Sequence, residues 1–419
     1  HNVFPLYYNF FAGLGCQVIV PDEIDEAAFN RQTTSFCYPT QVAIGYLSTL
    51  IEKNPDYYFM PQLRELYVND GNDKQDFCAT CIFSQGEAYW MNSVFKDKNI
   101  KDKILDPTIN FRKGYDSQEK VFTEIGAKLG FGKKESAENY RKAVKVQEDF
   151  ENELKQTGKE ALAELHGKPD TFALVLFGRP HNAFTDDVNK GIPRKITTRG
   201  HMIIPYEMLD FDSEEMPSPF KESMHWEIGQ KLIKASIFVK KDPQLYAVFI
   251  TNFLCALDSF LVPHVRRVMG TKPSLTLELD GHTADAGINT RLDAFIDVIK
   301  NYIQVQKKGG EIKKEEFTPA RLVPENNELY FIGSDGKKTP FKDPSVKVLL
   351  PSMGDLGTQA LAAALRKVGI NAEALPIADE EVRMEGRALL TGKECIPLVV
   401  ILGGFMIYLK HKRKPVSYT

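Results

Sequence analysis

Short apolar runs alternate with helical patterns along most of the chain. Continuous apolar runs are typical of parallel strands buried on both faces of a sheet, and they occur at residues 172–177, 246–250 and 275–279. Shorter strands are predicted at residues 17–20, 56–60, 201–204, 346–350 and 372–375. Apolar positions recur at helical spacing in residues 6–15, 42–51, 191–199, 290–301 and 356–368. This alternation predicts an α/β protein with parallel sheets.

The pattern also divides the chain into segments. We expect a first α/β subdomain at residues 1–115, a charge-rich helical arm at 116–168 and a second α/β subdomain at 169–305. Residues 306–344 are charged or rich in turn formers and are expected to be a linker. The order helix, glycine, strand, acidic turn, Cys-x-Pro and apolar helix then returns. Residues 345–419 are therefore expected to be a third, partial subdomain that repeats the first.

Three of the predicted strands end in polar or cysteine-bearing loops. These loops contain Arg179, Cys255 and His282. Ligands of open α/β sheets bind at the carboxyl ends of the strands, so the three residues are expected to share one crevice. Arg179 is suited to bind a carboxylate or phosphate, or to pair with Asp280. Asp280, His282 and Asp285 form either an acid/base cluster or the N-terminal turn of the next helix. Arg179, His282 and Asp285 are the candidate substrate-binding residues.

The cysteines carry the most chemical information. Cys37 and Cys395 both precede x-Pro at predicted helix starts, where the helix N-terminus lowers a thiol pKa and favours a negative group. Cys78 and Cys81 form a C-x-x-C pair, a spacing shared by iron–sulfur, zinc and redox sites. With Cys255, these are the candidate metal ligands. The alternative for each is a small buried apolar side chain, which is our expectation for Cys16.

Composition excludes several classes. A net charge of −3 gives no electrostatic footprint for nucleic acid. Six cysteines in 419 residues are too few for a disulfide scaffold and indicate a reducing, cytoplasmic compartment. Residues 396–409 are apolar but shorter than the roughly 20 residues that span a bilayer, so a buried helix with a basic end is expected there and no membrane association. The chain opens and closes abruptly, as expected for a fragment of a longer protein.

Several motifs, in order along nearly the whole chain, resemble the acyl-CoA dehydratase activase-related proteins. These are relatives of the 2-hydroxyacyl-CoA dehydratase D component and of the double-cubane-cluster proteins. The resemblance rests on Phe4-Pro5-Leu6, Cys37-Tyr38-Pro39, Gly178-Arg179-Pro180, the stretch Asn252 to Phe260, His282-Thr283-Ala284-Asp285-Ala286-Gly287 and Gly392-Lys393-Glu394-Cys395-Ile396-Pro397. Leu254, Ala256 and Leu257 stand where that family usually has glycine and proline, and Ser35 and Gln41 flank the Cys37 motif where glutamate and lysine are common.

The resemblance implies repeated Rossmann-like subdomains with a helical insertion, and an oxygen-sensitive iron–sulfur cluster, [4Fe-4S] or double-cubane, typical of anaerobic metabolism. It implies Cys37, Cys81 and Cys255 as the best ligands, with Cys395 as a further family cysteine. Low-potential electrons would come from an ATP-hydrolysing activase domain or subunit and pass to a small molecule or CoA thioester. We also expect a homodimer.

The leading hypothesis is therefore an iron–sulfur electron-transfer or reductase component; as an enzyme it would be an ATP-coupled low-potential reductase or dehydratase component. One alternative is a non-catalytic docking module of the same family that has lost its cluster, motivated by the bulky residues around Cys255. Another is a zinc-binding structural protein.

Overall fold

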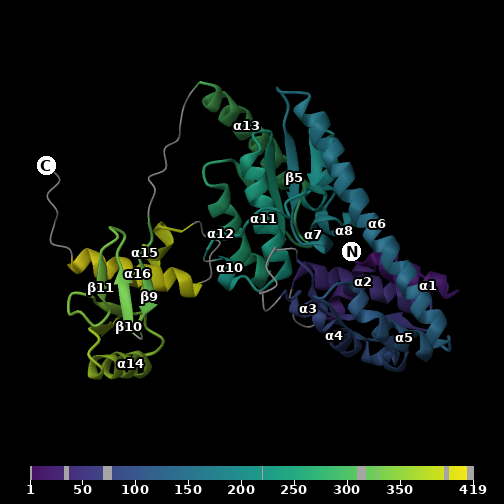
Figure 1. The fold of residues 1–419 in the computed structure, drawn as a ribbon, viewed down its shortest axis with the longest axis horizontal. Coiled ribbons are helices and arrows are strands. Elements are labelled where there is room, and N and C mark those ends of the chain that lie inside the picture. The colour runs from purple at the N-terminus through teal and green to yellow at the C-terminus, as the bar shows by residue number, and fades with distance from the viewer. Residues whose placement is uncertain are drawn as a thin grey trace. The chain divides into compact units, whose positions relative to one another are not determined.

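In this computed structural model, four parallel strands form the largest sheet, in the order β6-β5-β7-β8 (Figure 1). They are β5 (Ala173–Phe177), β6 (Met202–Pro205), β7 (Leu245–Asn252) and β8 (Ser274–Leu279). Strands β5 and β7 are buried along their whole length, as continuous apolar runs require. The strands expected at 172–177, 201–204, 246–250 and 275–279 are thus confirmed, and so is the α/β class.

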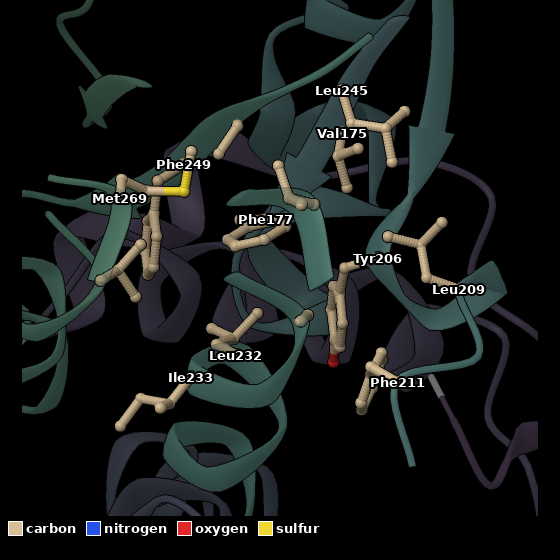
Figure 2. Packing of buried hydrophobic residues seen from close by; sticks show 14 of the residues in the cluster. Val175, Phe177, Tyr206, Leu209, Phe211, Leu232, Ile233, Leu245, Phe249 and Met269 are labelled. Carbon is tan, nitrogen blue, oxygen red and sulfur yellow. The ribbon is translucent and has the colours of Figure 1, made fainter. Parts of the chain in front are cut away.

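Helices cover both faces of this sheet. Alternate residues of β5 divide between two cores: Val175 and Phe177 face one, Leu174 and Leu176 the other. The first core is closed by α11 (Glu227–Lys241) and α12 (Ala256–Met269), and Figure 2 shows Leu232 and Ile233 of α11 packing toward it. The second core is closed by α9 (Ile192–Thr197) and α13 (Asp285–Lys307). Short helices α7 (Pro180–Ala183), α8 (Asp186–Asn189) and α10 (Phe220–Ser223) lie in the connections.

The N-terminal subdomain has two small parallel sheets, β1-β3 and β2-β4. Its strands are β1 (Tyr58–Phe59), β2 (Gln62–Leu66), β3 (Ile104–Leu105) and β4 (Thr108–Phe111), and its helices are α1 (Phe4–Gly13), α2 (Tyr38–Glu52), α3 (Ile82–Gln85) and α4 (Glu87–Val94).

The prediction of a strand at residues 17–20 is wrong. That stretch has no strand partner within the described part of the chain, and Ile19 and Val20 are exposed, so their apolar side chains do not reach a core.

The charge-rich arm is helical, as expected, and it joins the two subdomains. It comprises α5 (Glu119–Lys128) and α6 (Lys133–His166). Tyr140 and Val144 of α6 belong to the core of the N-terminal subdomain, whereas Leu165 belongs to a core of the four-stranded sheet. Figure 1 shows α6 running alongside both subdomains. Gly158 lies against the carbonyl of Met208, where no side chain would fit. One long helix therefore belongs to two cores.

Tertiary contacts separate residues 1–310 from residues 311–419. The second unit contains an antiparallel sheet β9-β10-β11 and a parallel pair β12-β13. Its elements are β9 (Arg321–Glu325), β10 (Glu328–Ile332), β11 (Lys338–Pro340), β12 (Val348–Leu350), α14 (Asp355–Lys367), β13 (Ala372–Ala374), α15 (Glu380–Ala388) and α16 (Ile396–Lys412). Part of the stretch expected to be a linker, 306–344, thus forms a sheet, because the apolar residues of 329–332 pair with both neighbouring strands.

Helices α15 and α16 cross at two glycines. A Cβ atom on Gly386 would collide with the carbonyl of Val399, and one on Gly403 with the carbonyl of Val382. Val399 is buried, but Ile396 and Leu409 are exposed, so α16 is less buried than expected. Among the described residues, no helix is long and apolar enough to cross a membrane.

The structure describes residues 2–32, 37–68, 78–218, 220–308, 318–326, 328–390 and 396–412. Cys395, one of the candidate ligands, lies outside these residues, as does Ser35.

Candidate cysteine site

Arg179 is buried at the carboxyl end of β5. The preceding residue, Gly178, has φ +146° and lies so close to β7 that a Cβ atom would be 2.5 Å from the carbonyl oxygen of Ile250. Glycine therefore permits the close turn that directs the chain from β5 into Arg179. Only 3% of Arg179 is exposed, and a buried guanidinium needs compensating partners.

Three cysteines provide some of these partners, and each directly precedes a helix. Cys37 is the N-cap of α2, Cys81 of α3 and Cys255 of α12, all with extended backbone. The N-cap of a helix projects its side chain toward unpaired backbone N–H groups. The helix start expected at Cys37 is thus present, and Cys81 and Cys255 share the same local geometry.

The arginine contacts two of the thiols directly. Its Nη2 donates to Cys255 Sγ at 2.8 Å, and its Nη1 donates to Cys81 Sγ at 3.7 Å. The third cysteine, Cys37, is within electrostatic reach of both Arg179 and Cys81. Residues from the N-terminal subdomain and from the loop after β7 therefore meet around one guanidinium, although they lie far apart in the sequence.

The pKa values follow from burial and from this charge. Burial raises the pKa of the Cys37 thiol, opposed by hydrogen bonds from Thr40 and by the positive charge of Arg179. Burial raises the pKa of the Cys255 thiol to about 12, and the negative charge of Asp258 contributes to this rise. The positive charge of Arg179 acts in the opposite direction. Metal ligation requires thiolates, so metal binding at these cysteines would release protons.

Contacts from the second subdomain hold Cys37 in place. Tyr38, the first residue of α2, accepts a hydrogen bond from Lys190 Nζ at 2.8 Å. About two turns further along α2, Tyr46 Oη donates to Asp187 Oδ2 at 2.5 Å, and Val42, between the two tyrosines, packs with Val188. The beginning of α2 is therefore docked on α8, which places its N-cap cysteine at the arginine.

Asp258 completes the site, and the sequence reasoning did not single it out. It is 1% exposed, and its Oδ1 lies 3.4 Å from Arg179 Nε. Thr251 donates to its other oxygen at 2.5 Å, and the Asp258 backbone N–H donates to Cys255 Sγ at 3.3 Å. Cys255 and Asp258 have the three-residue spacing of a helix capping box. This spacing is the feature of the sequence that could have identified Asp258.

Cys78 has a different environment from Cys81. Its sulfur lies 3.9 Å from Gln230 Nε2, and burial raises the pKa of its thiol. Ala79, between the two cysteines, receives a hydrogen bond from the Glu227 backbone at 3.1 Å and donates to the His225 carbonyl at 2.9 Å. These bonds fix the C-x-x-C segment beside α11, with Cys81 at Arg179 and Cys78 at Gln230.

The two other candidate substrate residues, His282 and Asp285, lie where the loop after β8 leads into α13. Asp280 accepts hydrogen bonds from the His282 backbone and the Thr283 hydroxyl, which makes it part of the turn before α13. Asp285 lies 3.4 Å from Lys195, and His282 is exposed. The carboxylate that pairs with Arg179 is thus Asp258 rather than Asp280, because α12 brings Asp258 beneath the guanidinium.

Three free thiols and one buried guanidinium make up this site. Within the described ranges, no three His, Cys, Asp or Glu side chains are grouped so that they could hold a single metal ion, and Cys16, Cys37, Cys78, Cys81 and Cys255 are unbridged. Three thiols near a buried cation, each at a helix start, are donors of the type that would hold an iron–sulfur cluster, and the cation would offset part of its negative charge.

Comparison with known proteins supports the family assignment. Residues 1–209 match the family model described as CoA enzyme activase uncharacterised domain. No curated protein and no solved structure matches the chain. The matched region includes Cys37, Cys81 and Arg179 and ends before Cys255. Residues 1–209 thus belong to the CoA enzyme activase uncharacterised domain family, which confirms the resemblance to the acyl-CoA dehydratase activase-related proteins.

Proposed function

We propose that the chain binds an iron–sulfur cluster through Cys37, Cys81 and Cys255 and works as an electron-transfer or reductase component. The observation that supports this most directly is the meeting of the three N-cap cysteines around Arg179. A bound cluster would supply one-electron redox chemistry at low potential.

The residues of the site suit such a group in two ways. Cys37 and Cys255 are buried, and exclusion of water protects a cluster and lowers its potential. Arg179 donates hydrogen bonds to the sulfurs of Cys81 and Cys255, which stabilises thiolate ligands. The thiols come from two subdomains, so the site requires their correct docking.

The partner and the acceptor follow from the family. The first 209 residues belong to a CoA enzyme activase-related family, so we propose that an ATP-hydrolysing activase domain or subunit supplies the electrons. The acceptor would be a small molecule or a CoA thioester. A homodimer remains part of the proposal.

Anaerobic reconstitution with iron and sulfide tests the cluster. We expect bound iron and acid-labile sulfide and a broad absorption band near about 400 nm. We expect a lower iron content in each of the variants Cys37→Ser, Cys81→Ser and Cys255→Ser. The control Cys16→Ser should bind as much iron as the parent chain. If the three serine variants bind as much iron as the parent chain, or if the parent binds none, the proposal is wrong.

The docking-module alternative was motivated by crowding around Cys255. Of the three residues behind this argument, Leu254 is 62% exposed, Ala256 is also exposed and Leu257 is half-buried, so the side chains of Leu254 and Ala256 do not fill the space beside the thiol. Elemental analysis of anaerobically purified chain separates the alternatives: stoichiometric zinc without iron favours a structural zinc protein, and neither metal favours the docking module.

A further inference from the structure

The pair formed by Arg179 and Asp258 has unusual geometry for a structural ion pair. Both residues are more than nine-tenths buried. Their closest charged atoms, Arg179 Nε and Asp258 Oδ1, are 3.4 Å apart, and neither atom has a hydrogen-bond partner within the described part of the chain. A buried pair that served stability alone would be expected to form the two-pronged contact that guanidinium and carboxylate groups favour.

The terminal nitrogens of Arg179 instead point to sulfur. Nη2 is 2.8 Å from Cys255 and Nη1 is 3.7 Å from Cys81. Asp258 is held from the other side by the hydroxyl of Thr251. The carboxylate is thus fixed behind the guanidinium, and the guanidinium is fixed against the thiols.

We propose that Arg179 and Asp258 are a pair of fixed opposite charges that sets the reduction potential of the group bound by Cys37, Cys81 and Cys255. This inference rests on the proposed cluster. Arg179 is not a ligand but a positioning and charge-compensating residue, and Asp258 acts through it and through Cys255.

The signs follow from electrostatics. Reduction adds a negative charge to the group, so a nearby cation favours reduction and a nearby anion opposes reduction. The low dielectric of the buried site enlarges both effects. Removing the charge of Asp258 should therefore make the potential more positive, and removing that of Arg179 should make it more negative.

The test compares charge removal at this pair and at a second Arg–Asp pair in the same unit. Asp258→Asn removes the negative charge at nearly constant size, Arg179→Gln removes the positive charge and shortens the side chain, and Arg179→Lys keeps the positive charge. Arg199→Gln and Asp293→Asn are the matched controls. Arg199 Nε lies 2.6 Å from Asp293 Oδ1. Arg199 precedes β6 and therefore lies at the amino ends of the parallel strands, whereas the loop with Cys255 follows β7 at their carboxyl ends.

Each reconstituted protein is assayed for iron and sulfide per chain and titrated anaerobically for its potential. We expect opposite shifts for Asp258→Asn and Arg179→Gln, a smaller shift for Arg179→Lys and none for the controls. Unchanged potentials in fully loaded variants overturn the inference and leave the proposed function standing. Shifts of the same sign overturn it as well, because a merely structural role would give them. If Arg179→Gln does not fold, Asp258→Asn decides: a more positive potential supports the inference, and an unchanged or more negative one overturns it. A parent chain without iron overturns the proposed function and the inference together.

Discussion

Replacing Leu254 with glycine tests the shape of the loop that presents Cys255. Leu254 has φ +67°, in the left-handed region that leucine rarely adopts. Its side chain is 62% exposed, so shortening it removes little buried area. The backbone conformation therefore dominates the effect of this substitution.

The magnitude follows from comparing glycine with alanine at this position. Left-handed backbone costs a non-glycine residue about 1–2 kcal/mol, whereas glycine costs about 0.5–1 kcal/mol in additional conformational entropy. We therefore expect Leu254→Gly to be about 0.5–1 kcal/mol more stable than Leu254→Ala. In a helix or strand the order would be reversed.

Urea unfolding followed by tryptophan fluorescence measures this difference. The chain has two tryptophans, Trp90 and Trp226, and both belong to the unit of residues 1–310, so the signal reports on the relevant unit. Leu254→Asn should lie between the other two variants, because asparagine tolerates left-handed backbone. An alanine variant as stable as the glycine variant would refute the assigned backbone conformation.

Three further outcomes follow from the structure. Gly158→Ala should destabilise the chain by about 1–3 kcal/mol in urea unfolding, because its Cβ would collide with the Met208 carbonyl; Gly287→Ala, with open space around it, is the control and should be neutral or stabilising. Gly403→Ala should lower the melting temperature of the second unit by separating α15 from α16. Burial raises the pKa of Glu87 to about 7, so between about pH 4.5 and 7 the folded state holds a proton that the unfolded state has lost. The free energy of unfolding should therefore fall by up to about 3 kcal/mol as the pH rises through that range. Glu87→Gln should remove that loss, and the difference between its melting temperature and that of the parent should widen from pH 5 to 7.5; a constant difference would contradict the shift.

The large sheet was predictable because its strands are uninterrupted apolar runs. Residues 173–177 and 245–252 are buried on both faces, and no amphipathic helix has that pattern. The stretch 17–20 looks similar in sequence but has no strand partner among the residues that the structure describes. Burial of a strand depends on a neighbour, and a single sequence does not reveal the neighbour.

The cysteine site was predictable in its parts but not in its arrangement. Cys-x-Pro and the strand-end position indicated Cys37 and Cys255 from local pattern alone. Asp258 was missed because its burial depends on how α12 packs beneath Arg179. The different surroundings of Cys78 and Cys81 arise from backbone hydrogen bonds to residues 225–227, a long-range pairing with no local signature.

The origin of the three thiols in two subdomains has a consequence for the lifetime of the protein. A group bound by Cys37, Cys81 and Cys255 would act as a cross-link between the N-terminal subdomain and the four-stranded sheet. Such a link stabilises the docked arrangement by mass action. Oxidative loss of the group would then weaken the junction around Arg179 and increase local opening there. Exposure to air would thus lead to proteolysis at the subdomain junction, and damage to the site would be followed by degradation of the chain.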